Sequence, residues 1–161
     1  MMERTAVEHG FRDFYRREFP AMVALATAVM GDASKGEDVA QEALTRAYRR
    51  WETVSEYDKP GAWLRRVTIN LSLSARKRAA DEVRARLRLR SVEVEEPDPH
   101  DEVWEALAKL PGKQRAAVAL HFLEDRSHAE IAEILGCAEA TSRVHLHRGR
   151  AAMVELLGGG R

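Results

Sequence analysis

Several features that would point to other classes of protein are missing from these 161 residues. The single cysteine, Cys137, cannot form an internal disulfide, which fits a reducing compartment such as the cytoplasm. The longest nearly apolar run, Ala21 to Met30, is about half of the ~20 residues that a membrane span needs. The N-terminus also lacks the charged and then apolar pattern of a signal peptide. We therefore expect a cytoplasmic protein that does not insert into a membrane.

Motifs for catalysis and for cofactor binding are also absent. No Gly-rich phosphate loop and no nucleophile motif appears. His145 and His147 are two residues apart on an expected helix and cannot face the same side, and Cys137 has no partner at metal-ligand spacing. The sequence therefore predicts a protein that is not an enzyme and has no metal or other cofactor.

Helical periodicity recurs along the chain, and no stretch shows the alternation of a strand. Pro20 predicts a kink or a break between an aromatic helix from about Val7 and a second helix, Ala21 to Met30. The clearest amphipathic helix follows an expected capping box, Ser34 to Glu37, and is apolar on one side from Val39 to Trp51. Residues 52–59 read as a loop. We predict an all-α protein.

The net charge is zero, but charge is unevenly distributed. Residues 61–90 contain 9 Lys and Arg against 2 Asp and Glu, whereas residues 91–110 contain 1 against 7. A long helix from Pro60 carries the basic block on its expected polar side: Arg65, Arg66, Arg76, Lys77, Arg78, Arg84, Arg86, Arg88 and Arg90. Asn70 lies among its apolar positions, where a lone Asn is usually half-buried. The acidic segment 91–101, with Pro97 and Pro99, predicts a flexible linker between two small helical domains, 1–90 and 102–161.

Residues 126–150 have the pattern of a helix-turn-helix. Ser127 and Glu130 form a capping box, and Gly136 stands where a left-handed C-cap residue is expected. A second helix, from about Glu139 to Leu157, is expected to bury Ala140, Val144, Leu146 and Val154 and to carry Arg143, His145, His147, Arg148 and Arg150. Before the motif, Pro111 is expected in the first turn of a helix whose Val118, Leu120, Phe122 and Leu123 pack beneath it. A short helix, a turn and a cationic helix are the arrangement that places a recognition helix in the major groove.

Three segments in this order resemble bacterial RNA polymerase sigma factors of the extracytoplasmic-function group (group 4), which contain only the second and fourth conserved regions. They are GDASKGEDVAQEALTRAYRRW at 31–51, PGAWLRRVTINLSLSARKR at 60–78 and LPGKQRAAVALHFLEDRSHAEIAEILGCAEATSRVHLHRGR at 110–150. The resemblance covers nearly the full length. It implies that 1–90 is region 2, that 102–161 is region 4, and that the protein directs core polymerase to promoters.

The resemblance also implies contacts for region 2. Asp38, Gln41 and Glu42, with Arg46 one turn further, would face the clamp helices of the polymerase beta-prime subunit. The segment from Thr53 to Asp58, including Val54 and Ser55, would capture a base flipped from the non-template strand of the minus-ten element. Asn70 would lie near that base, since an amide can both donate and accept at a base edge. Arg76, Lys77 and Arg78 would contact phosphates.

For region 4, the resemblance implies that Arg143, His147, Arg148 and Arg150 face the minus-thirty-five element. Where the family commonly has a hydrophobic residue, a basic one and then Ser-Arg, this chain has Ser142, Arg143, Val144 and His145, which leaves the register of the recognition helix open. The expected partners are the beta and beta-prime subunits of core polymerase and promoter DNA. The linker would permit an anti-sigma factor to pack between the domains, although the sequence identifies none.

The linker acids and the function itself each have an alternative. Glu93, Glu95, Glu96 and Asp98 would occupy a basic channel of polymerase, or they are simply a solvated tether. The whole chain could be a stand-alone helix-turn-helix regulator of duplex DNA, or an interaction module whose basic helix binds an acidic partner. The acidic face of 38–46 and the PGAWLRR segment favour the sigma factor, because neither rival needs them.

Overall fold

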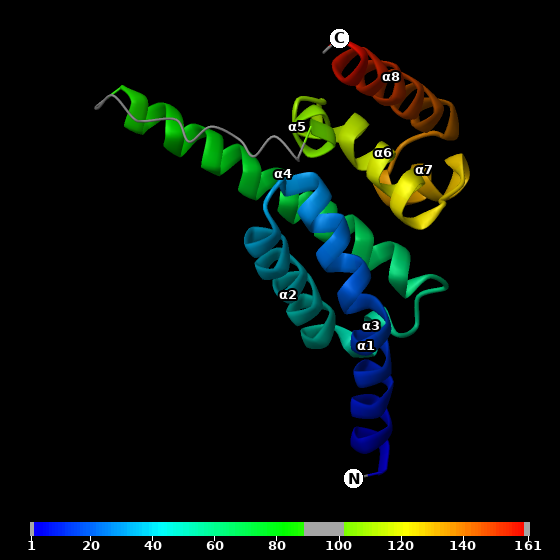
Figure 1. Ribbon diagram of the computed structural model, residues 1–161. Coiled ribbons are helices and arrows are strands. Elements are labelled where there is room, and N and C mark those ends of the chain that lie inside the picture. Colours follow the sequence, from blue (N-terminus) through cyan, green and yellow to red (C-terminus); the bar gives the residue numbers. More distant parts are fainter. Residues whose placement is uncertain (1, 89–101, 160–161) are drawn as a thin grey trace.

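The computed structural model describes residues 2–88 and 102–159, and every regular element in these ranges is a helix (Figure 1). The N-terminal part contains α1 (Met2–Met30), α2 (Ala33–Arg49), α3 (Trp51–Val54) and α4 (Pro60–Leu87). The C-terminal part contains α5 (Glu102–Ala108), α6 (Gly112–Glu124), α7 (His128–Leu135) and α8 (Glu139–Gly158). The predicted linker, 91–101, lies outside the described residues. The all-α prediction is confirmed.

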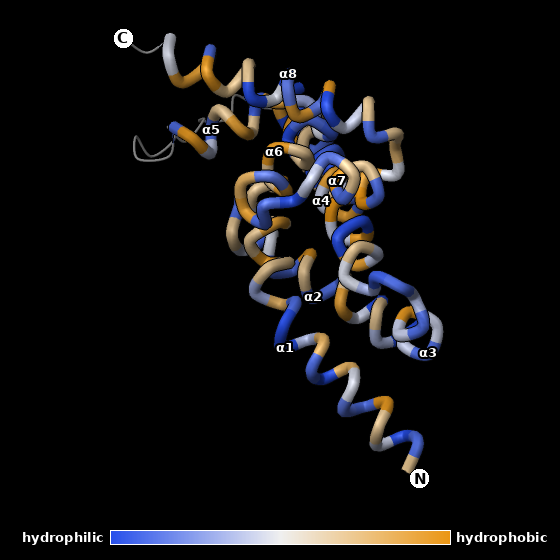
Figure 2. The backbone as a smooth tube through the Cα atoms, turned by 90° about the vertical axis from the view of Figure 1, so that its right-hand side faces the viewer, coloured by the Kyte–Doolittle hydropathy of each residue, from blue (hydrophilic) through white to orange (hydrophobic). Residues whose placement is uncertain are grey.

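Helix α1 continues through Pro20, so of the predicted kink or break the break is excluded. Pro20 lies on the exposed side of the helix, where water can bind the carbonyl that loses its hydrogen bond. Phe14 and Met22, on either side of it, are both buried in the same core. Their packing holds the helix together across the proline. The N-terminal turns of α1 extend away from the other helices (Figure 2).

Helix α2 begins at Ala33, one residue before Ser34, which was its predicted N-cap. The carboxylate of Asp32 accepts a hydrogen bond from the Lys35 N–H at 3.0 Å, so Asp32 and not Ser34 is the N-cap. Gly31, with φ of 75°, makes the sharp turn between α1 and α2. A Cβ at Gly36 would lie 2.7 Å from the backbone nitrogen of Thr27. Glycine at this position therefore lets α1 and α2 pack closely.

The two domains share one hydrophobic core. Phe14, Leu25 and Leu64 from the first domain belong to the same buried cluster as Leu120 and Ile131 from the second. Helix α6 packs against α1, and α7 packs against α4. The C-terminal domain is therefore held against the N-terminal domain, with α8 on the outside (Figure 1).

Two predictions for α6 need correction. Pro111, with ψ of 146°, is the N-cap residue and precedes the first helical residue, Gly112. Val118 and Leu120 are buried as predicted, but Phe122 is 64% exposed and Leu123 is 48% exposed. These two side chains instead line an apolar groove of about 520 Å³ between α5, α6 and α8, together with Val103, Trp104, Leu107, Met153, Val154 and Leu157.

Candidate functional site

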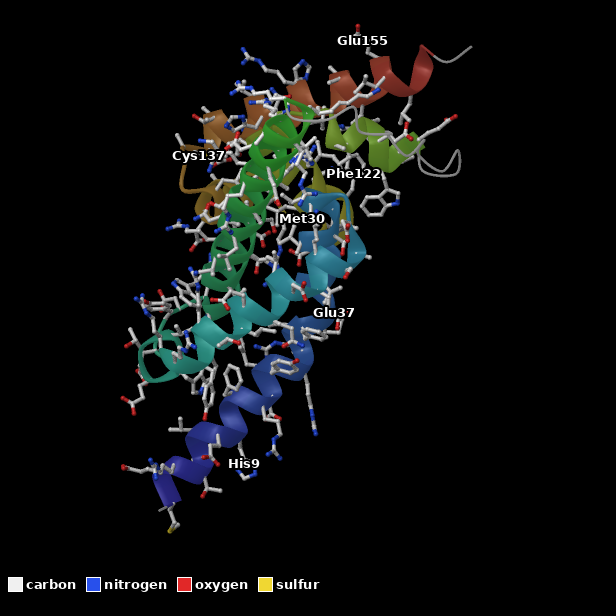
Figure 3. All side chains as sticks on the ribbon, turned by 90° about the vertical axis from the view of Figure 1, so that its left-hand side faces the viewer. His9, Met30, Glu37, Phe122, Cys137 and Glu155 are labelled. Carbon is white, nitrogen blue, oxygen red and sulfur yellow. The ribbon has the colours of Figure 1, made fainter. Side chains whose placement is uncertain are left out.

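Helix α2 presents one polar face to solvent. Its other face is buried through Val39, Ala40, Ala43, Leu44 and Ala47, all at most 9% exposed. The predicted docking residues Asp38, Gln41, Glu42 and Arg46 are all exposed. Figure 3 labels Glu37, which precedes them on the same helix. Arg46 Nε donates to Glu42 Oε1 at 3.1 Å, and the Tyr15 hydroxyl lies 3.4 Å from Gln41 Oε1. Such exposed contacts contribute little to stability, so this face is free to bind a partner.

The segment predicted to capture a flipped base is partly helical, because α3 covers its first residues. Thr53 and Ser55 are exposed, whereas the side chain of Val54 is completely buried and anchors the segment to the core. A pocket of about 210 Å³ lies beside the segment, lined by Tyr57, Asp58, Lys59, Ala62, Trp63, Arg66 and Glu133. Glu133 comes from the C-terminal domain. Both domains therefore form the walls of this pocket.

Along α4, the predicted DNA-contacting residues have different environments. Asn70 is exposed and not half-buried, so its amide is available to a ligand. Lys77 and Arg78 are also exposed. Arg76 is only partly exposed: Nη1 donates to the carbonyl of Val29 at 3.1 Å and Nη2 donates to the carbonyl of Ala108. Burial lowers the pKa of Arg76. In this conformation Arg76 links the C-terminal ends of α1 and α5.

Arg65 was assigned to the polar side of α4, and this is wrong, since it is 5% exposed. Its Nε donates to Glu124 Oε2 at 2.7 Å, and Nη1 lies 3.0 Å from Glu18 Oε2. Burial alone would lower the pKa of Arg65, but the hydrogen bond and the negative charge of Glu124, followed by those of Glu18, outweigh it and raise the pKa. The guanidinium thus joins a carboxylate of its own domain to one of the other.

Arg115 is a second buried arginine that sequence reasoning missed. It is 4% exposed and donates to the carbonyls of Val29 at 3.1 Å, Leu107 at 3.0 Å, Ala108 at 3.2 Å and Leu110. Burial, and then the nearby charge of Arg76, lower its pKa to about 10. The one feature of the sequence that indicates burial of Arg115 is the apolar run 116–120 that follows it. The negative ends of α1 and α5 stabilise its charge.

The helix-turn-helix forms as predicted. The side chain of Ser127 accepts a hydrogen bond from the Glu130 N–H, and the Ser127 N–H donates to Glu130 Oε1, both at 3.2 Å. Gly136 ends α7 with φ of 68°. Cys137 follows in the turn that leads to α8 (Figure 3).

Of the four residues predicted to be buried in α8, only Leu146 is buried, so the expected register needs correction. Its buried residues are Ser142, Leu146 and Gly149, whereas Val144 is 44% exposed and Val154 is 73% exposed. Ala140 is also exposed. Ser142 Oγ lies 2.8 Å from the carbonyl of His128, and a Cβ at Gly149 would lie 2.6 Å from Val118 Cγ2. Small residues let α8 approach α6 and α7, and hydrophobicity alone does not reveal such positions.

The cations of α8 remain on its outer surface. Arg143, His147, Arg148 and Arg150 are exposed, and His145 is half-buried. Arg143, His147 and Arg150 line one open pocket of about 370 Å³ together with His128, which begins α7. Arg150 also lies over the ring of Phe122, with 5.8 Å between its guanidinium carbon and the ring centroid. Arg148 does not line this pocket.

Comparison with known proteins identifies the family of this chain. The family model for sigma-70 region 2 matches residues 14–82, and the model for sigma-70 region 4 matches residues 100–153. The RNA polymerase sigma-E factor of Streptomyces coelicolor is 32% identical, with 91% of this chain and 85% of that protein covered. The extracytoplasmic-function sigma factor SigW of Bacillus subtilis is 31% identical, with 80% of this chain and 79% of that protein covered. The chain belongs to the extracytoplasmic-function sigma factors.

A solved structure agrees with this assignment. The sigma factor RpoE, in its complex with the anti-sigma factor NepR from Bartonella quintana, matches 94% of this chain and 99% of its own, with a TM-score of 0.76 and 25% identity. This sigma factor therefore recognises promoters for RNA polymerase, and the stand-alone regulator is not favoured. Sigma factors are non-enzymatic regulators. Among residues 2–88 and 102–159, no helix is long and apolar enough to cross a membrane.

Proposed function

We propose that this sigma factor docks on core polymerase through the exposed face of α2, formed by Asp38, Gln41, Glu42 and Arg46. The observation that carries the proposal is the contrast between the two faces of this helix. One face is buried in the core, whereas the side chains of the other are exposed and make only surface contacts. A helix with exposed acids and amides suits a positively charged partner surface, such as the clamp helices of the beta-prime subunit.

The minus-ten element is read by the segment 53–58 and by Asn70. Thr53 and Ser55 are exposed and can contact an extruded base, while the buried Val54 positions them. A protein pocket that holds a flipped base favours the melted promoter over the duplex. Lys77 and Arg78 contact phosphates. Arg76 joins them only if its bonds to the carbonyls of Val29 and Ala108 are released.

The minus-thirty-five element is read by α8 through Arg143, His147, Arg148 and Arg150, all of which are exposed. The register with Ser142, Leu146 and Gly149 buried supports this assignment, since it turns these four away from the core. Arginine on a recognition helix binds guanine edges with two hydrogen bonds, which contributes about 1–3 kcal/mol of discrimination per contact. Polymerase supplies all the chemistry, and the protein acts in the cytoplasm.

An anti-sigma factor is a further proposed partner. The related RpoE structure contains such a protein.

The acids of the linker, Glu93, Glu95, Glu96 and Asp98, keep their proposed role in a basic channel of polymerase. Their replacement by Ser or Asn should change the yield of abortive RNA or promoter escape, and unchanged transcripts would exclude that role.

In vitro transcription tests the proposed function. Purified bacterial core polymerase, a promoter library and this protein should give promoter-specific transcripts, read by sequencing. The double variant Asp38→Ala/Gln41→Ala should lose them while keeping its fold, because both side chains are exposed. Glu102→Ala/Glu155→Ala, which changes two exposed residues of the C-terminal domain, should keep them. If the wild-type protein gives no transcripts but still binds duplex DNA without polymerase, it is instead a stand-alone regulator.

A further inference from the structure

The C-terminal end of α7 contacts two cations that lie beside the proposed minus-ten surface. Lys59 Nζ is 2.9 Å from Glu133 Oε2, a contact between the two domains. The hydrogen bond and then the charge of Glu133 raise the pKa of Lys59. Arg66 Nε donates to the carbonyl of Ile134 at 3.2 Å, and its Nη2 donates to the carbonyl of Glu133. Both cations thus bind the C-terminal end of a helix from the other domain.

These cations belong to the surface that is proposed to read the minus-ten element. Arg66 is four residues before Asn70, and both are exposed, so they share one face of α4. Lys59 directly follows the segment 53–58. Both cations line the 210 Å³ pocket beside that segment, and Glu133 lines it from the other domain. The C-terminal domain therefore covers the N-terminal end of this surface.

The groups that cover it are chemically similar to DNA phosphate. A carboxylate and the free carbonyls at the end of a helix are negative acceptors, and they attract cations as a phosphate does. Glu133 and the last turn of α7 therefore satisfy Lys59 and Arg66 in the absence of nucleic acid. A promoter strand that reaches these cations has to displace α7.

Promoter geometry gives an independent reason for α7 to move. The minus-ten and minus-thirty-five elements are roughly 25 base pairs apart, and at about 3.4 Å each this is roughly 85 Å. Helix α8 begins at Glu139, six residues after Glu133, so its start lies within roughly 22 Å of the Lys59 contact. Its 20 residues add about 30 Å at most. In this conformation, therefore, α8 cannot lie at the minus-thirty-five element while the Lys59 and Arg66 end of α4 lies at the minus-ten element of an unbent promoter.

We propose that Lys59 and Arg66 are further promoter-contacting residues, and that Glu133 and the C-terminal turn of α7 occupy them in the DNA-free chain. Region 4 then has to leave α4 before the minus-ten strand binds. This inference rests on the proposed function, because it assumes that α4 and the segment 53–58 read the minus-ten element. It adds two contact residues and a self-blocked state to that function.

Binding of a single strand tests the proposal. The probe is an oligonucleotide with the non-template minus-ten sequence selected by the transcription experiment, and the protein is the full chain without polymerase. Glu133→Gln should bind about two- to fivefold more tightly than Glu155→Gln, which removes an equal charge from an exposed site on α8. Equal affinities of these two variants would overturn the blocked state.

The same probe tests the direct contact. Arg66→Gln should bind more weakly than wild type, and the slope of log affinity against log salt should fall by about 0.7, as expected for one lost phosphate contact to a single strand. Arg12→Gln, an exposed change on α1, should leave both quantities unchanged. If Arg66→Gln binds as tightly as wild type or more tightly, Arg66 only holds the domains together and the proposal is wrong.

Zero-length carbodiimide cross-linking with mass spectrometry tests whether the two domains are in contact. The free protein should yield a Lys59–Glu133 link, because the amine and the carboxylate are 2.9 Å apart. Lys59→Arg should abolish the link, since a guanidinium does not form it. In the promoter complex with polymerase the link should disappear. A link that persists there, or one that is absent from the free protein, would contradict the self-blocked state.

The outcomes separate the inference from the function on which it rests. If no promoter-specific transcripts form with polymerase, the proposed function fails and the inference fails with it. If wild type transcribes specifically but Glu133→Gln behaves like Glu155→Gln and no 59–133 link forms, the function stands and the inference alone is refuted.

Discussion

Replacement of Arg65 by Met should strongly destabilise the protein. The Arg65 side chain is 6% exposed, and its two partners, Glu18 and Glu124, are each 10% exposed. Without the guanidinium, two buried carboxylates remain close together. Their other cations are more exposed, with Arg17 at 68% and Arg126 at 29%. Neither can take the place of the lost partner.

The expected magnitude is the cost of breaking a buried ion pair by removal of one partner, about 3–5 kcal/mol. A surface pair would cost only about 0–1 kcal/mol. The triple variant Arg65→Met/Glu18→Gln/Glu124→Gln should recover most of the loss, because it leaves no buried charge without a partner. Urea denaturation of the three proteins gives the free energies of unfolding.

A loss below about 1 kcal/mol in Arg65→Met, or a triple variant that is no more stable than Arg65→Met, would refute the assignment of Arg65 as a buried charge shared by the two domains.

Three further changes test the packing and the cap. Gly149→Ala should lower stability by about 1–3 kcal/mol, because its Cβ would lie 2.6 Å from Val118 Cγ2, whereas Gly158→Ala meets open space and should be tolerated; thermal melts compare them. Leu120→Ala should cost about 2–5 kcal/mol in urea titrations, but Phe122→Ser, at a 64% exposed position, less than about 1 kcal/mol. Hydrogen bonds from Arg126 and then Ser127 lower the pKa of Glu130, so its contribution to stability is present above about pH 4.5 and is lost as the pH falls through the lower folded value. Glu130→Gln should therefore lose less stability than wild type between pH 5 and pH 3, measured by urea denaturation.

Local signals in the sequence were sufficient for much of the fold. The capping box at Ser127 and the left-handed Gly136 are determined by residues within a few positions, and both were predicted correctly. The apolar side of α2 was predicted for the same reason. The cap of this helix was not, because Asp32 and Ser34 are both good N-cap residues and only the turn at Gly31 selects the first.

The remaining features depend on packing between helices that are distant in the sequence, partly across the domain interface. Arg65 and Arg115 look like solvent-facing cations in a local pattern, and only the packed structure supplies the carboxylates and helix ends that bind them. The register of α8 was missed for a related reason, since Ser142 and Gly149 are buried for their small size. Phe122 shows the converse, because its hydrophobicity predicted burial but the side chain is 64% exposed.

The cations of α4 divide into two groups in this conformation. Arg65, Arg66 and Arg76 near the interface are bonded to carboxylates or carbonyls of the other domain, whereas Lys77 and Arg78 are exposed. A ligand shifts a conformational equilibrium only through its different affinity for the two states. The proposed docking face of α2 is exposed in the closed chain, so contacts confined to that face cannot drive opening. The energy for opening has to come from contacts with region 4 or with the covered end of α4. The proposed assignment therefore couples the release of α8 to the binding of the minus-ten strand.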